Sequence, residues 1–195
     1  MTQNVDRETV VSRLLAADDI LILCHKNPDG DTIGSGTALC LALQQLGKNA
    51  AVLCSDPIPA MYDYMPITVF DGSFSPAFVV AVDVAGIQLF GERNNIRDYA
   101  EHVNLCIDHH GSNSGYAYET LLDPGAAAAC EFLLDVIVDM GVLLGRKPSA
   151  EVPAGAKSVK LEDPTRTISR NHAAISFDQD GTLWIEDYGS LNGTY

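Results

Sequence analysis

The sequence lacks long hydrophobic runs and has few basic residues. No stretch of about 18 consecutive apolar residues is present, so we expect no membrane-spanning helix and no membrane partner. Twelve lysines and arginines stand against 26 aspartates and glutamates, which gives a formal net charge of −14. An excess of negative charge repels long nucleic acid, so we expect no long duplex nucleic acid as a partner. The start, MTQNVDRETV, lacks the basic and apolar regions of a signal peptide, and we expect a cytoplasmic protein.

The sequence also lacks paired cysteines of the CxxC type. Its five cysteines all lie in apolar stretches, at Cys24, Cys40, Cys54, Cys106 and Cys130. This pattern is typical of buried free thiols in a reducing compartment, and it argues against a zinc site built from cysteine.

Apolar runs alternate with helical patterns over the first 141 residues. The expected strands are 19–24, 50–54, 77–83 and 103–108, and the expected helices are 5–17, 34–47 and 125–141. This alternation predicts an α/β fold, with a parallel Rossmann-like sheet and helices on both faces.

After Gly141 the pattern changes to short β-prone runs between turn signals. The candidate strands are VLLGR, SVKL, HAAISF and LWIED. We therefore expect a domain boundary near residue 142, followed by a small, partial β-sandwich.

Three of the expected strands end in residues that bind metals. His25 follows the first of them, Asp83 ends another, and Asp108-His109-His110 ends a third. Ligand sites of parallel sheets lie beyond the carboxyl ends of the strands, so these side chains are expected to converge. A lone aspartate or histidine here would be explained as a turn, cap or core residue. Three converging clusters predict a metal site instead, and imidazole with several carboxylates suits manganese better than calcium or structural zinc.

The spacing in HKNPDGD adds carboxylates to the same site. His25 and Asp29 lie four residues apart across a turn, and Asp31 points to a neighbouring position. Two cations about 4 Å apart that share a carboxylate can activate a water and clamp a phosphoryl group. We also expect the helix to open at residues 34–36 and to turn its free N–H groups toward an anion.

The segments HKNPDGD, AVDVAG, IDHHGSN and LLDPGAAAACEFL occur in order over about residues 8–141 and resemble the DHH phosphoesterase family. The most similar branch hydrolyses short oligoribonucleotides and pAp, usually with manganese. The resemblance implies His25, Asp29 and Asp83 as ligands of one metal, and Asp31, Asp83 and His109 as ligands of a second.

The same resemblance implies a catalytic role for two further residues. His110 would face the substrate phosphate. Asp108 would orient the residues of the site without binding the metal itself. Asn113 and residues 123–131 would support its wall. A further aspartate ligand and the C-terminal substrate domain of the family are not found in the pattern, so we expect the second metal to be held weakly.

The segments GRKPS, SRNHAAI and DYGSLNGTY resemble part of a forkhead-associated (FHA) domain, a β-sandwich that binds phosphothreonine peptides. The resemblance covers about residues 142–195. It implies phosphopeptide contacts from Arg146, Ser169, Arg170 and Asn192, because charged and amide donors suit a phosphate and a peptide backbone.

Three functions remain open from the sequence. The first is a manganese-dependent phosphoesterase over residues 1–141 that acts on short oligonucleotides or pAp. The second is a phosphothreonine-binding module over 142–195, with a phosphorylated protein as partner. The third is an inactive hybrid of two partial domains.

Overall fold

The computed structural model describes residues 2–145, 157–160, 173–177 and 183–187. The chain divides into two units, Met1–Leu134 and Asp135–Tyr195, and each is described by itself. The domain boundary expected near residue 142 remains a prediction.

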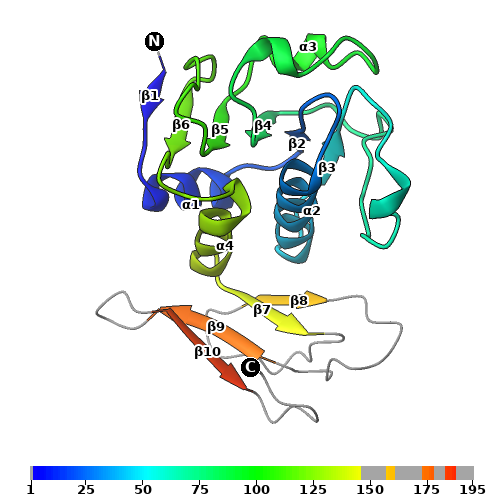
Figure 1. Ribbon diagram of the computed structural model, residues 1–195. Coiled ribbons are helices and arrows are strands. Elements are labelled where there is room, and N and C mark those ends of the chain that lie inside the picture. The colour runs from blue at the N-terminus through cyan, green and yellow to red at the C-terminus, as the bar shows by residue number, and fades with distance from the viewer. Residues whose placement is uncertain (1, 146–156, 161–172, 178–182, 188–195) are drawn as a thin grey trace. The chain divides into compact units, whose positions relative to one another are not determined.

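The first unit is built on a six-stranded sheet in which every pair of neighbouring strands is parallel. Its strands are β1 (Gln3–Asn4), β2 (Ile20–Leu23), β3 (Ala50–Leu53), β4 (Phe78–Val82), β5 (Leu105–Asp108) and β6 (Glu119–Leu122). They lie side by side in the order β1-β6-β5-β4-β2-β3 (Figure 1). Strand β2 pairs with β3 on one side and β4 on the other, so the strand order reverses there. The expected parallel α/β sheet is confirmed, and β1 and β6 are additional to the prediction.

The helices follow the strands along the chain. They are α1 (Arg7–Ala16), α2 (Gly30–Gln45), α3 (Arg97–Ala100) and α4 (Ala129–Asp139), with 3-10 turns η1 (Ala60–Tyr62) and η2 (Ile87–Leu89). All three helices expected from the sequence are present, with shorter bounds for α1 and α4.

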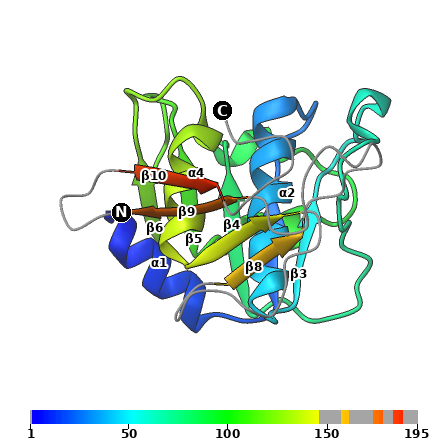
Figure 2. The ribbon, with the colours of Figure 1, turned by 90° about the horizontal axis from the view of Figure 1, so that it is seen from below.

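Both faces of the sheet are covered by helices, as predicted. On one face, a side chain at Gly36 of α2 would touch Ile22 and Val82. On the other face, Leu21 belongs to a buried cluster that includes Ile96, next to α3. Figures 1 and 2 show α1 and α2 on one side of the sheet, and Figure 1 shows α3 on the other. Because strands β2 to β5 are buried on both faces, their sequences are apolar except for Asp108 at the end of β5.

Helix α2 begins at Gly30, four residues before the expected start at residue 34. Asp29 is its N-cap, and the Asp29 carboxylate accepts the N–H groups of Asp31 and Thr32. The expectation that residues 34–36 offer free N–H groups to an anion is therefore wrong, because these residues lie inside the helix. Gly36 has a packing role instead: a Cβ there would lie 2.9 Å from Cys24 Sγ, so only glycine lets α2 approach the sheet this closely.

The second unit contains a four-stranded sheet with the order β10-β9-β7-β8. Its strands are β7 (Val142–Gly145), β8 (Lys157–Lys160), β9 (Ala173–Phe177) and β10 (Leu183–Asp187), which matches the four candidate strands to within one residue at each end. The predicted phosphopeptide contacts lie outside the described residues, at Arg146, Ser169, Arg170 and Asn192.

The cysteines follow the prediction with one exception. Cys24, Cys40, Cys54 and Cys106 are free and buried, whereas Cys130, in the first turn of α4, is free and exposed. In the described part of the chain, no helix has the length and apolar character needed to cross a membrane.

Candidate metal centre

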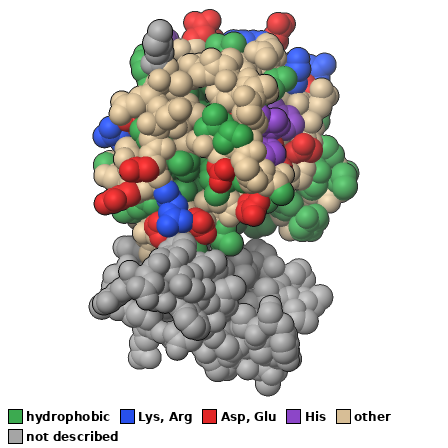
Figure 3. All heavy atoms as spheres, turned by 60° about the vertical axis from the view of Figure 1, so that its left-hand side comes forward, with side chains coloured by type: hydrophobic (Ala, Val, Ile, Leu, Met, Phe, Trp, Pro, Cys, Tyr) green, Lys and Arg blue, Asp and Glu red, His purple; other side chains and the backbone are tan. Residues whose placement is uncertain are grey.

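A pocket of about 380 Å³ lies at the carboxyl ends of β2, β4 and β5, where the strand order reverses. This is where ligands bind in open parallel sheets. Its lining residues are His25, Asp29, Asp31, Asp83, Leu89, His109, His110, Ala127 and Ala128. Every metal ligand expected from the sequence therefore reaches the same pocket. Figure 3 shows histidine side chains at the surface of this unit with acidic side chains beside them.

Asp83 lies at the centre of this pocket, directly after β4. Its side chain is only 3% exposed, and within the described structure its Oδ1 atom is buried without a hydrogen-bond partner. Burial raises the pKa of this carboxyl. Its backbone has a φ of 59°, in the left-handed region, which costs about 1–3 kcal/mol. A buried, unpartnered acceptor on a strained residue is the arrangement expected of a group that awaits a cation.

His25 and Asp29 face one side of Asp83. The Nε2 atom of His25 lies 3.7 Å from Asp29 Oδ1 and 3.7 Å from Asp83 Oδ2. The other ring nitrogen, Nδ1, lies 2.7 Å from the carbonyl oxygen of Lys26. Because a carbonyl only accepts, Nδ1 carries the proton, and in the neutral ring Nε2 keeps its lone pair. These three residues bring one ligand atom each within 4.8 Å of one another, as the prediction for the first metal requires.

His109 faces the other side of Asp83. Its Nε2 atom lies 3.4 Å from Asp83 Oδ1 and 3.8 Å from Asp31 Oδ2. Its Nδ1 atom lies 3.2 Å from the carbonyl oxygen of Ala126, so the same argument leaves Nε2 free to bind a metal. Asp83 thus separates two imidazoles that both present Nε2.

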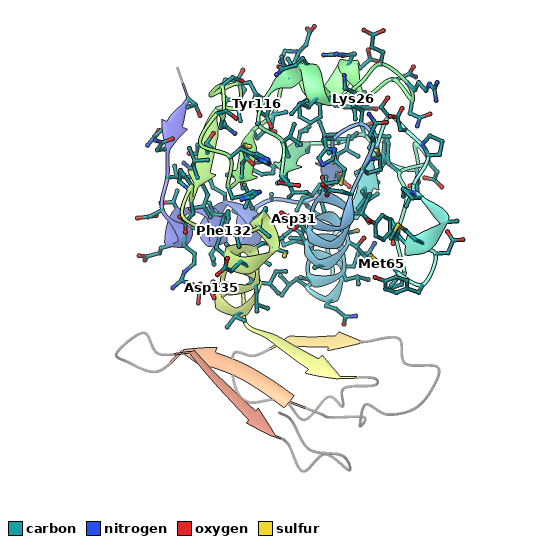
Figure 4. The ribbon with its side chains drawn as sticks, viewed as in Figure 1. Lys26, Asp31, Met65, Tyr116, Phe132 and Asp135 are labelled. Carbon is teal, nitrogen blue, oxygen red and sulfur yellow. The ribbon has the colours of Figure 1, made fainter. Side chains whose placement is uncertain are left out.

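Asp31 has a second role that the sequence did not reveal. Its carboxylate accepts the N–H groups of Ala129, at 2.7 Å, and Cys130, at 2.9 Å, and a hydrogen bond from Ser35 Oγ. It therefore caps the start of α4 from a position on α2 (Figure 4). Burial by itself raises the pKa of Asp31, but these donors outweigh it and lower the pKa overall. On this side, Asp83, His109 and His110 offer ligand atoms within 4.8 Å of one another, and Asp31 is not part of that group.

Asp108 and His110 form a pair beside the metal ligands. Asp108 is fully buried, and its Oδ1 atom accepts a hydrogen bond from His110 Nδ1 at 2.8 Å. Its Oδ2 atom accepts a hydrogen bond from the Asn113 amide at 2.6 Å. The bond to Asp108 raises the pKa of His110. Because Nδ1 is occupied, Nε2 is the ring nitrogen that His110 can offer to a ligand.

The pocket also contains residues that the sequence did not single out individually. Leu89 belongs to η2, and Ala127 and Ala128 precede α4 within the predicted wall segment 123–131. No local sequence pattern marks Leu89 as a pocket residue, because the short 3-10 turn that carries it contains no polar motif.

The donor set fits a divalent cation. Three histidines and the Asp29 carboxylate offer ligand atoms close to Asp83, and its unpartnered oxygen is the acceptor that a cation would satisfy. Mixed imidazole and carboxylate ligands suit transition metals such as manganese, iron or zinc.

Two family models match parts of the chain. Residues 19–157 match the model described as the DHH family, N-terminal domain. Residues 142–195 match the FHA domain model.

Comparisons with individual proteins agree with the first of these matches. The bifunctional oligoribonuclease and PAP phosphatase NrnA of Thermus thermophilus is 29% identical over 154 residues, which is 70% of this chain and 42% of the relative. The crystal structure of an exopolyphosphatase-related protein from Bacteroides fragilis superposes with a TM-score of 0.59 at 22% identity. That match covers 69% of this chain and 43% of the other, and it supports the fold alone. The chain thus spans less than half the length of each protein.

Proposed function

The chain belongs to the DHH family, and we propose that it is a manganese-dependent phosphoesterase that hydrolyses short oligonucleotides or pAp. The observation that carries this proposal is Asp83, a buried carboxylate with an unpartnered oxygen between the Nε2 atoms of two histidines. The substrate class comes from the Thermus thermophilus relative, whose name describes an oligoribonuclease and PAP phosphatase.

We propose two positions for a cation, and the geometry supports both. His25, Asp29 and Asp83 would hold the first ion, and Asp83 with His109 would hold the second. Asp31 would complete the second position, although its carboxylate is shared with the N–H groups of α4. The chemistry that divalent cations supply is charge neutralisation and Lewis acidity at the phosphoryl group.

His110 would bind the phosphate and transfer a proton. Its Nδ1–H is held by Asp108, which fixes the ring so that Nε2 is the atom available to a phosphate oxygen or a leaving alcohol. The raised pKa of His110 favours the protonated ring, which is the form that can donate from Nε2. Asn113 fixes Asp108 in turn and so supports this orientation.

The charge of the pocket favours a small substrate. None of its nine lining residues is a lysine or arginine, so phosphate binding depends on the bound cations and on histidine. A long polyanion would meet the net negative charge of the protein without compensating cations.

Hydrolysis of pApA and pAp by the purified chain, with and without manganese, tests the proposal. We expect turnover only with manganese, and a loss of roughly a thousandfold in Asp83→Asn, because several kcal/mol of charge stabilisation disappear with this ligand. Asp98→Asn is the matched control, since Asp98 is an exposed aspartate of α3 outside the pocket.

Two outcomes would contradict the proposal. Full activity in Asp83→Asn would show that the pocket is not the active site. No turnover in the wild-type chain would favour the third alternative, an inactive assembly of two partial domains. Phosphothreonine binding by residues 142–195 rests on the FHA match and stays a prediction.

A further inference from the structure

A tyrosine lies against the turn that carries two of the proposed metal ligands. Gly30, the first residue of α2, stands between Asp29 and Asp31. The hydroxyl end of the Tyr62 ring lies near this glycine: its Oη atom is 3.5 Å, and its Cε1 atom 3.8 Å, from the position that a Cβ at residue 30 would occupy. Because residue 30 is glycine, no side chain stands between the tyrosine and the backbone of the metal-binding turn.

The tyrosine is held in place by its own segment. The N–H of Tyr62 donates to the carbonyl of Pro59 at 2.9 Å, and the carbonyl of Tyr62 accepts from Met65 at 2.9 Å. Pro57 and Pro66 restrict the flanking backbone. A backbone that is already ordered before binding loses little conformational entropy when a ligand contacts the side chain it carries.

The same segment exposes apolar surface that the core does not use. Met61 is 71% exposed and Tyr64 is 74% exposed, although both are large hydrophobic residues. Tyr62 itself is half-buried, and it is not a member of the described buried cluster that contains Leu21 and Ile96. The position of Tyr62 therefore contributes little to that core, which leaves its ring available to a ligand.

Among the described residues, the lining of the pocket has no aromatic side chain other than histidine to recognise a nucleobase. Its rings are the three histidines, which the proposed function assigns to metal and phosphate, and its other lining residues are three aspartates, Leu89, Ala127 and Ala128. A base attached to a phosphate in the pocket must therefore be bound at the rim. Aromatic side chains bind bases by stacking, and this contact tolerates any base sequence.

We propose that Tyr62 is the stacking surface for the nucleobase next to the phosphate that is bound at the metal centre. The inference rests on the proposed function, and it identifies a residue that makes the site selective for nucleotides over other phosphate esters.

Equilibrium binding of AMP and of ribose 5-phosphate to the full chain with manganese tests this role, since the two probes differ only in the base. Tyr62→Ala should weaken AMP binding by roughly 5- to 100-fold, as expected for the loss of one stacked base. Binding of ribose 5-phosphate should not change. Tyr62→Phe keeps the ring and should bind AMP as the wild type does.

Tyr118→Ala is the matched control. Tyr118 is 66% exposed and precedes β6, at the amino ends of the strands and away from the pocket. This variant should bind both probes normally. The unfolding midpoint of each variant, measured in parallel, shows whether the chain is still folded.

The inference and the proposed function can fail separately. Equal binding of the two probes by the wild type, or equal weakening of both in Tyr62→Ala, would overturn the stacking role. Selective AMP binding that depends on Tyr62, in a chain that hydrolyses neither pApA nor pAp, would leave the stacking role in place and remove the proposed activity.

Discussion

The two ends of the parallel sheet carry similar polar residues but satisfy them differently. At the amino ends, the Asp18 carboxylate accepts the N–H groups of Asp19 and Asn49 at 2.8 and 2.9 Å. Asp19 in turn accepts the Asn49 amide at 2.8 Å. At the carboxyl ends, Asp83 has a buried oxygen with no hydrogen-bond partner in the described residues. Carboxylates cluster at both ends, and among the described residues a buried carboxylate oxygen without a partner is found at the carboxyl ends alone.

Other contacts at the amino ends follow the same rule. Asn104 accepts the N–H of Val79 at 2.8 Å, and Lys48 donates to the carbonyl groups of Leu15 and Ala17. These groups join strands to the preceding helices and loops. The comparison teaches that a cluster of acidic residues marks a functional site only where the protein itself does not complete the hydrogen bonding.

Among the tests of this contrast, we expect the largest effect in Asp83→Asn, as a loss of the stability that manganese adds to the folded protein. The raised pKa of Asp83 means that the folded state disfavours its charge, so stability falls as pH rises through the ordinary carboxyl range. Removing the charge should therefore leave the metal-free protein at least as stable as the wild type. The wild type should gain about 2.7 kcal/mol when manganese is present at a hundred times its Kd, and the variant should gain little.

Thermal unfolding with and without manganese measures both quantities, with Asp98→Asn as the control. A variant that is strongly destabilised without metal would show that Asp83 is a structural residue, like those at the amino ends. Equal stabilisation of both proteins by manganese would place the metal elsewhere.

A smaller effect is expected for Asp108→Asn, and it is opposite in kind, since this variant should lose stability even without metal. Asp108 is buried like Asp83, but both of its oxygens accept hydrogen bonds, from His110 and Asn113. In this variant an NH2 group would face one of the two donors, His110 or Asn113. We therefore expect a loss of about 1–3 kcal/mol of stability at every metal concentration. Because His110 loses its orientation, kcat should fall roughly 10- to 100-fold.

Asn113→Ala provides the matched test, since it removes one donor to Asp108 without touching the histidine. It should lower both stability and kcat, each by less than Asp108→Asn does. If Asp108→Asn were as stable as the wild type, the distinction between the two buried aspartates would be wrong.

Much of the fold could be predicted because it depends on local pattern. Strands β2 to β5 are buried on both faces, so each appears as a continuous apolar run that ends in a polar residue. The site residues His25, Asp83 and His109 could be placed together for the same reason, since parallel strands end at one edge. Asp29 as N-cap could have been found as well, because aspartate is one of the residues preferred at the start of a helix.

The remaining features depend on contacts between distant segments. Strands β1 and β6 are short and partly exposed, so their sequences carry no apolar run. The hydrogen bonds from Ala129 and Cys130 to Asp31 join residues nearly a hundred positions apart. The contact between Tyr62 and Gly30 likewise depends on where a long loop returns to α2.

The smallest expected effect lies at the amino ends, in the ion pair between Arg13 of α1 and Glu119 of β6. Arg13 Nη2 lies 2.7 Å from Glu119 Oε1, and Arg13 Nε lies 3.0 Å from Oε2. This hydrogen bonding lowers the pKa of Glu119, so its stabilising effect is complete above the ordinary pKa and is lost as pH falls through the lowered one. Arg13→Gln should therefore be slightly less stable at about pH 7 and no less stable at about pH 3. Unfolding of Arg13→Gln, Glu119→Gln and the double variant at both pH values measures the coupling. Hydrolysis and manganese binding should be unchanged in all three variants, because an ion pair at the amino ends contributes to the fold and not to the metal site. A loss of activity in any of them would contradict the contrast between the two ends of the sheet.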